Sequence, residues 1–397
     1  MFKINLFLIF LLSCLNSCID PFDAEIVDFE SAIVIEALLT NEMKRHEIGI
    51  NRTFTFEDRK LLAEKNANVM VVDDAGNSFN FRETTDGLYL SEIPFAIVAD
   101  RSYRLLITTE NGNNYNSEEE FMPAVTQINE LRSERITNDA GEDGIAILID
   151  SFDPNRSSNF YRYTFEETYK IIAPKWSPLD LIGDPDSDDE CAVTTVSKET
   201  EQKVCYTSDA SNTIILTNTT DLEEDRVAGF QVHFINRNNY IISHRYSILV
   251  KQHIQSNGAF LFYEKLKEFS GNESIFSETQ PGFLEGNIKS ENNTKEKVIG
   301  YFEVASVSEQ RLFFNYEDFY AGEELPPYVV PCDPNAPGIR GQGGACILRP
   351  TIESGREKFY QENGEPGPFE GPYLTVNRIC GDCTALGEIN IPEFWVE

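Results

Sequence analysis

Short apolar segments separated by turn residues fill the first third of the chain. They either alternate apolar and polar side chains or form brief β-branched runs, and Gly-containing turns follow residues 72 and 109. The segments lie at residues 32–39, 68–72, 78–82, 103–109 and 114–117. Several short strands at this spacing are typical of an antiparallel sandwich. We therefore predict a mainly β protein that begins with a sandwich domain of immunoglobulin or transthyretin type.

The pattern continues beyond Met122-Pro123, which we interpret as the boundary between an N-terminal domain, residues 18–122, and a C-terminal domain, residues 123–397. Further strand-like segments lie at residues 144–150, 159–165, 231–235 and 246–252. One helix is predicted from about Ser256 to Gly271, because Ser is a good N-cap and Gly is a common stop. Its apolar face indicates packing on a sheet, and its members are Phe262, Leu266 and Phe269. We expect a larger β-rich domain with one packed helix.

Two long polar segments, residues 174–204 and 321–372, are predicted to be loops. Beyond the N-terminal region the chain has an even number of cysteines, which in an exported protein indicates disulfides. These disulfide candidates are Cys191, Cys205, Cys332, Cys346, Cys380 and Cys383. Pairing of near neighbours would join Cys191 to Cys205 and Cys332 to Cys346, while Cys380 and Cys383 could pair together or reach elsewhere. Zinc is disfavoured, because the chain has one C-x-x-C and no second pair at finger-like spacing.

The N-terminus has the pattern of an export signal. Lys3 precedes a short apolar core, and the sequence Leu15-Asn16-Ser17-Cys18 resembles a bacterial lipobox. Residues 1–17 would then be a signal peptide, and Cys18 would carry the lipid after cleavage. Cys14 is a competing lipobox cysteine, but its use would shorten an apolar core that is already short. The other alternative is a plain secreted protein.

The charge and hydropathy of the chain restrict its possible partners and its mode of membrane attachment. The chain has a formal net charge of −33, so nucleic acid and anionic lipid are poor partners. No later segment is long and apolar enough to cross a bilayer of about 30 Å, so the lipid at Cys18 would be the membrane attachment. We expect a lipid-anchored protein of the cell envelope.

Common catalytic motifs are missing from the sequence. There is no H-E-x-x-H, G-x-S-x-G or P-loop pattern, and a catalytic role for any of the four histidines is disfavoured. No catalytic residue is therefore predicted. The best metal candidate is the acidic turn with Asp184, Asp186 and Asp188, whose carboxylates could bind Ca²⁺. A solvated acidic loop is the better interpretation, because the turn fails as an EF-hand, and no cofactor is predicted.

Several motifs in order along the chain resemble a known family. They include the residues after the lipobox, the segment 33–41, Cys205-Tyr206, the segment 245–252, Gly286-Asn287-Ile288, the segment 300–308 and the ending 380–395. Together they resemble a Bacteroidota lipoprotein family, that of domain of unknown function 4249. The resemblance covers essentially the whole mature chain. It implies a lipid-anchored outer-membrane protein that is an accessory of a TonB-dependent barrel receptor, and it supplies no catalytic residues. For such a protein, the acidic residues Asp20, Asp23 and Glu25 after Cys18 favour the cell surface.

The function expected from these features is capture or retention of a ligand beside a TonB-dependent receptor. Contacts are expected from the long loops and from aromatic residues of the second domain, such as Phe160, Tyr161 and Trp176. The ligand is not identified by the sequence. A structural or adhesive surface protein is the first alternative, since a β-sandwich does not decide function. A surface polymer hydrolase that uses two carboxylates is the second.

Overall fold

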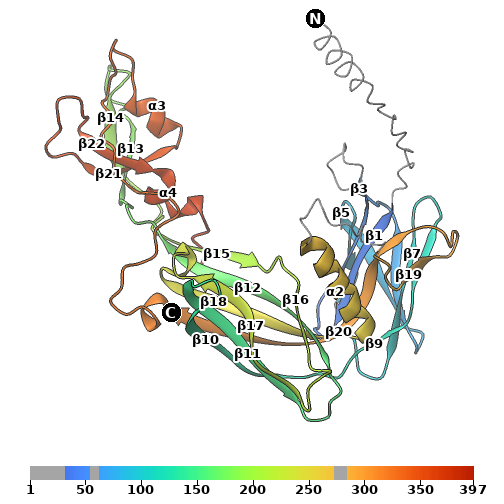
Figure 1. Cartoon of the computed structure of the whole chain (residues 1–397). Helices are drawn as coiled ribbons and strands as arrows, with labels where there is room; N and C mark the ends of the chain where they lie inside the picture. The colour runs from blue at the N-terminus through green and yellow to red at the C-terminus, as the bar shows by residue number, and fades with distance from the viewer. Residues whose placement is uncertain (1–31, 54–61, 272–283) are drawn as a thin grey trace, which may run out of the picture.

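The computed structural model describes residues 32–53, 62–271 and 284–397. The predicted signal peptide and Cys18 lie outside these residues. The fold is mainly β, as expected, and Figure 1 shows two β-rich bodies followed by a smaller lobe. Among the described residues, no helix has both the length and the hydropathy needed to span a membrane.

The N-terminal body is a curved sheet wrapped around its own core. Both hairpins predicted from period-two alternation are confirmed, as β4 pairs with β5 and β7 pairs with β8. Gly76 and Gly112 occupy the turns with φ near +84°, a conformation that favours glycine. The strands are β1 (Ile33–Thr40), β2 (Glu47–Arg52), β3 (Leu62–Ala63), β4 (Asn68–Asp73), β5 (Ser78–Thr85), β6 (Leu88–Ser91), β7 (Ser102–Thr108), β8 (Asn114–Ser117), β9 (Glu120–Phe121) and β19 (Ile288–Ser290).

A segment from much later in the chain completes this body. Strand β19 pairs with β8, and the first half of β20 (Val298–Asn315) pairs in parallel with β1. The side chain of Asn287 closes the gap between them, since its amide donates to the Phe302 carbonyl at 3.0 Å and its oxygen accepts from the Phe302 N–H at 2.8 Å. Ile288 and Phe302 belong to the N-terminal core. The domain boundary predicted after residue 122 therefore does not separate the two bodies completely, because β19 and the first half of β20 pair with N-terminal strands.

The central body is a two-layer sandwich that shares β20 with the first. The second half of β20 pairs antiparallel with β18, so one strand runs through both bodies. One layer contains β12, β15, β16, β18 and β20, the other contains β10, β11 and β17, and a common core lies between them. Its further strands are β10 (Ile128–Thr137), β11 (Asp143–Asp153), β12 (Phe160–Ile172), β15 (Val204–Ala210), β16 (Ile215–Asn218), β17 (Asp225–Asn236) and β18 (Arg245–Ile254).

The two predicted long loops come together as a third unit, which we call the disulfide-tied lobe. It has a small core of Leu181, Leu348 and Phe359, and Figure 1 places it at the end of the molecule away from β1. Its elements are the hairpins β13 (Leu179–Gly183)–β14 (Val193–Ser197) and β21 (Glu357–Glu362)–β22 (Tyr373–Asn377), with α3 (Leu348–Glu353). The segments predicted as loops thus contain short strands that pair only within the lobe.

All six predicted disulfide cysteines are bonded, but the pairing expected from sequence proximity is wrong. The bonds join Cys191 to Cys346, Cys205 to Cys383, and Cys332 to Cys380. Two of them link segments 155 and 178 residues apart. The short-loop argument fails because loop-closure entropy grows only slowly with length, so folding can bring distant cysteines together. Cys380 and Cys383 sit in successive short helices and bond to different parts of the fold.

The remaining helices connect or cover the sheets. The predicted helix is confirmed as α2 (Asn257–Gly271), which lies on β12 and β20 beside the N-terminal body (Figure 1). The short elements are α4 (Arg378–Gly381) and the 3₁₀ helices η1 (Tyr240–Ile242), η2 (Tyr316–Asp318) and η3 (Cys383–Ala385).

Candidate functional site

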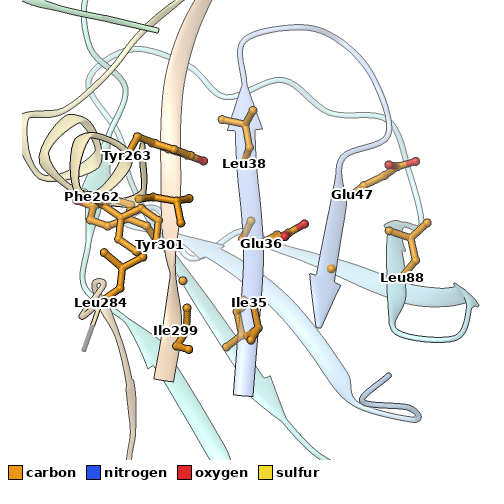
Figure 2. Close-up of a pocket in the computed structure, with 15 residues that line it drawn as sticks. Ile35, Glu36, Leu38, Glu47, Leu88, Phe262, Tyr263, Leu284, Ile299 and Tyr301 are labelled. Atoms are coloured by element: carbon orange, nitrogen blue, oxygen red, sulfur yellow. The ribbon is translucent and has the colours of Figure 1, made fainter. Parts of the chain in front are cut away.

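A groove of about 430 Å³ lies between α2 and the outer face of the N-terminal sheet (Figure 2). Most of its lining is apolar or aromatic. The residues come from α2, β1, β2, β6 and β20, together with Leu284. The lining residues include Val34, Glu36, Leu38, Glu47, Leu88, Phe262, Tyr263, Leu266, Ile299 and Tyr301.

The side-chain alternation of β1 and β20 creates the floor. On β1, Ile33 and Ile35 point into the core, while the alternate residues Val34 and Glu36 face the groove. Ile299 and Tyr301 follow the same rule on β20. The parallel register places Glu36 opposite Tyr301.

Helix α2 forms one wall. The Ser256 hydroxyl caps its first turn by accepting from the Ala259 N–H at 3.2 Å. Phe262 is buried against the sheet, and its ring centroid lies 5.6 Å from that of Tyr301. Tyr263 continues the wall along the groove (Figure 2), and Leu266 of the same helix also lines it. The apolar stripe that predicted packing on a sheet therefore also contributes to a cavity.

Two glycines shape the floor in different ways. Gly300 has φ of +135°, and a Cβ there would lie 1.9 Å from the Ile35 carbonyl oxygen, so only glycine allows β20 to approach β1 so closely. Gly49 on β2 is different, because a Cβ there would meet nothing closer than Glu36 at 3.7 Å. The missing side chain at Gly49 leaves open space in the groove.

A buried ion pair lies beneath α2, where the two bodies join. Arg162 of β12 donates to Glu303 of β20 at 2.9 Å, and the Glu303 side chain is fully buried. Gln255 donates to the second Glu303 oxygen at 2.8 Å, and the guanidinium of Arg162 lies 4.6 Å from the ring of Tyr263. Burial opposes the charge on Arg162, but the Glu303 carboxylate raises the pKa of Arg162 above its ordinary value. These contacts fix Tyr263, which lines the groove.

A second buried carboxylate supports the other aromatic wall. Glu120 of β9 accepts hydrogen bonds from the Tyr301 hydroxyl and from Asn287, the latter at 3.1 Å. Burial raises the pKa of Glu120, and the charge of Glu303 adds to this, although the hydrogen bonds oppose the rise. Both carboxylates therefore hold aromatic side chains in place from inside the protein.

The rim of the groove carries a different pair of acids. Glu36 and Glu47 are exposed, and their carboxylates form no ion pair or hydrogen bond with any described residue. The lining contains no Lys, Arg or His among the residues that the structure describes. The groove therefore combines an apolar body with a negatively charged edge.

The predicted metal candidates do not form a cluster. Asp186 and Asp188 are exposed, and Asp184 is half-buried with its carboxylate accepting from the Asp186 N–H at 3.0 Å. In the described ranges, the one group with suitable ligand atoms close together is Glu190, Cys191 and Cys346. Its two sulfurs are joined in a disulfide and are not available as thiolate ligands.

The aromatic residues proposed as ligand contacts have other roles. Tyr161 is fully buried and its hydroxyl donates to Asp225 at 2.7 Å, so it is a core residue. Phe160 packs on Phe260 of α2 at a centroid distance of 5.0 Å, and Trp176 packs against the core of the central body. None of the three lines the groove.

Sequence analysis did not predict the groove residues, because the apolar segment 32–39 has the pattern of a wholly buried strand. One signal was present: Glu36 is the single charged residue in that run, which is what a strand with one exposed face would show. A second signal lay in the family-like segment 300–308, which contains Gly300, Tyr301 and Glu303.

Two solved structures are distantly similar to the chain. A DUF4785 family protein from Legionella pneumophila shares 8% identity at a TM-score of 0.16, covering 55% of this chain and 50% of that one, so this chain spans about half its length. The B domain of a biofilm associated protein shares 8% identity at a TM-score of 0.11, covering 72% and 89%. Similarity at this level carries no argument about function.

No curated protein matches the chain. The family described as "Domain of unknown function (DUF4249)" matches residues 19–311, which is most of the chain and includes most of both β-rich bodies and every residue that lines the groove. The resemblance to domain of unknown function 4249 is thereby confirmed, and the protein belongs to the DUF4249 family.

Proposed function

We propose that the protein is a non-enzymatic, lipid-anchored accessory of a TonB-dependent barrel receptor at the outer membrane, where it captures a ligand for uptake. The lipobox-like sequence ending at Cys18 supports the anchor. The partner is what the resemblance to Bacteroidota lipoproteins of this family implies.

The groove is the observation that supports ligand capture. Its volume lies within the range of about 300–1,000 Å³ that is usual for small-molecule sites, and its mostly apolar lining with few polar groups is also usual for them. The buried contacts of Glu303 and Glu120 hold its aromatic wall in place before any ligand arrives. A preorganised wall reduces the entropy lost on binding.

The hydrolase alternative requires two carboxylates that reach a substrate. The buried acids nearest the groove are already engaged. Both oxygens of Glu303 have protein partners, and Glu120 holds Tyr301 and Asn287. These contacts favour structural roles for Glu303 and Glu120, so these two acids are not the pair that the hydrolase alternative requires.

Co-purification tests this proposal. The tagged full-length protein is extracted from native membranes in mild detergent, and a Cys18→Ala variant serves as the control that removes the lipidation site. We expect a barrel protein in stoichiometric amount with the wild-type chain and a lipid-modified Cys18 in its mass spectrum. Recovery without a barrel, under conditions where other lipoprotein–barrel pairs survive, would favour the structural or adhesive alternative.

A further inference from the structure

Charge and shape restrict which ligand the groove accepts. The carboxylates of Glu36 and Glu47 line the groove without a hydrogen-bond or ion-pair partner among the described residues. The described lining of the groove contains no basic side chain. An anionic ligand would meet two negative charges, whereas a cation would be attracted to both.

The aromatic wall also favours a cationic ligand. Phe262, Tyr263 and Tyr301 stand together on one side of the groove, and Glu36 points from β1 toward β2 on the other (Figure 2). Aromatic faces attract cations, and quaternary ammonium groups in particular. Tyr263 already makes such a contact with Arg162 from within the protein.

From these observations we propose that the groove binds molecules that carry a cationic group on an apolar body. This deepens the proposed ligand-capture function and rests on it. The apolar body lies along Val34, Leu38 and Ile299, and the cationic group lies between the aromatic wall and the rim carboxylates.

Gly49 provides a variant that fills the groove without disturbing the fold. Its backbone conformation is open to all residues, and its Cβ position is free of clashes. A valine there suits a β-strand and occupies the open floor. Gly364 offers a matched control, because it too has open space and an ordinary conformation but lies in the disulfide-tied lobe, after β21.

The test uses two rod-shaped fluorescent probes that differ in charge. The cationic rod is the trimethylammonium derivative of diphenylhexatriene, and the anionic rod is its propionate derivative. Each is titrated into the mature chain, residues 18–397, carrying Cys18→Ser so that no lipid is attached. We expect the cation to bind about tenfold more tightly than the anion, from one or two close carboxylates at a partly exposed site.

The variants separate charge from shape. The double variant Glu36→Gln and Glu47→Gln should reduce the preference for the cation to about twofold, because the carboxylates are lost but the aromatic wall still favours a cation. Gly49→Val should weaken both probes more than tenfold, and Gly364→Val should change neither. Circular dichroism confirms that each variant is folded.

Equal affinity of the wild-type chain for both probes, no binding, or binding unaffected by Gly49→Val would each overturn the inference. A dimer in sedimentation that Gly49→Val dissociates would assign the groove to a second copy of the chain instead. The outcome is independent of the barrel experiment. A barrel that co-purifies while the cationic rod fails to bind would remove this inference alone, and cation binding without a barrel would remove only the proposed partner.

Discussion

Removal of either partner of the ion pair between Arg162 and Glu303 is expected to destabilise the junction between the two β-rich bodies. Arg162 belongs to the central body, and Glu303 lies in the half of β20 that pairs with β1. We consider Arg162→Met and Glu303→Gln, singly and together. Glutamine keeps an acceptor for Gln255 and nearly the same volume, so the Glu303 variant removes charge rather than packing.

The size of the effect follows from burial. Glu303 is fully buried and the Arg162 side chain is 10% exposed, so either single variant leaves an uncompensated charge away from water. Such a loss costs about 3–5 kcal/mol. The double variant removes both charges and should lie within about 1–2 kcal/mol of the wild type. The two changes should therefore be strongly non-additive, as expected for residues in direct contact.

Equilibrium unfolding in urea measures these differences. The fluorescence of Trp176 and Trp395, which are the only tryptophans, reports on the central body, and circular dichroism follows all strands. The exposed pair of Lys289 and Glu118, each 63% exposed, provides the control cycle, with an expected coupling below about 1 kcal/mol. Losses below 1 kcal/mol for both single variants, or a double variant equal to their sum, would refute the reasoning.

Three further predictions concern stability and covalent structure. Burial tends to raise the pKa of Glu42, but hydrogen bonds from two lysines lower it to about 2 from 4.5, so its contribution is present above pH 4.5 and is lost as the pH falls toward 2. The wild type should therefore lose about 1–2 kcal/mol more stability than Glu42→Gln as the pH falls, allowing for solvent screening. If the urea midpoints of the wild type and the variant fell equally between pH 7 and 3, the result would contradict this. Gly300→Ala should lower stability by more than about 3 kcal/mol, against about 1 kcal/mol for Gly76→Ala at an open turn, as measured by thermal unfolding. Peptide mapping without reduction should yield cross-linked pairs, and recovery of pairs between neighbouring cysteines would contradict the fold; the expected pairs are Cys191–Cys346, Cys205–Cys383 and Cys332–Cys380.

Local patterns predicted the elements that depend on local physics. The hairpin of β4 and β5 follows from period-two alternation with a glycine in the turn, and α2 follows from its cap, its apolar stripe and its terminal glycine. The disulfide-tied lobe could not be predicted in this way. Its core has three fully buried side chains taken from two segments far apart in sequence, so neither segment has a periodic signal of its own.

Long-range pairing explains why the groove escaped prediction. The register that places Glu36 beside Tyr301 joins residues on strands 265 positions apart, and nothing in either segment specifies it. The parallel pairing also requires the close approach at Gly300, which a sequence shows only as one more glycine. Residue types of the lining were visible in the sequence, but their convergence depends on the tertiary fold.

The position of the groove relative to the proposed anchor gives a last test. Fourteen residues, 19–32, separate Cys18 from β1, and a fully extended chain of that length spans about 50 Å at most. The groove begins on β1, whereas the disulfide-tied lobe lies at the other end of the molecule (Figure 1). On the proposed function, the groove is therefore the part held near the membrane, where a barrel receives the ligand.

A longer tether should weaken this transfer without touching the groove. Inserting fourteen Gly and Ser residues after Glu25 doubles the tether, which lowers the effective concentration of groove and barrel about threefold. Uptake at limiting ligand should fall by a similar factor, while binding of the cationic rod in solution stays unchanged. An insertion of equal length in the open turn at Gly112 is the control, since it leaves the tether intact. Uptake that is insensitive to tether length would show that the barrel holds the protein directly, because a docked protein does not depend on its linker.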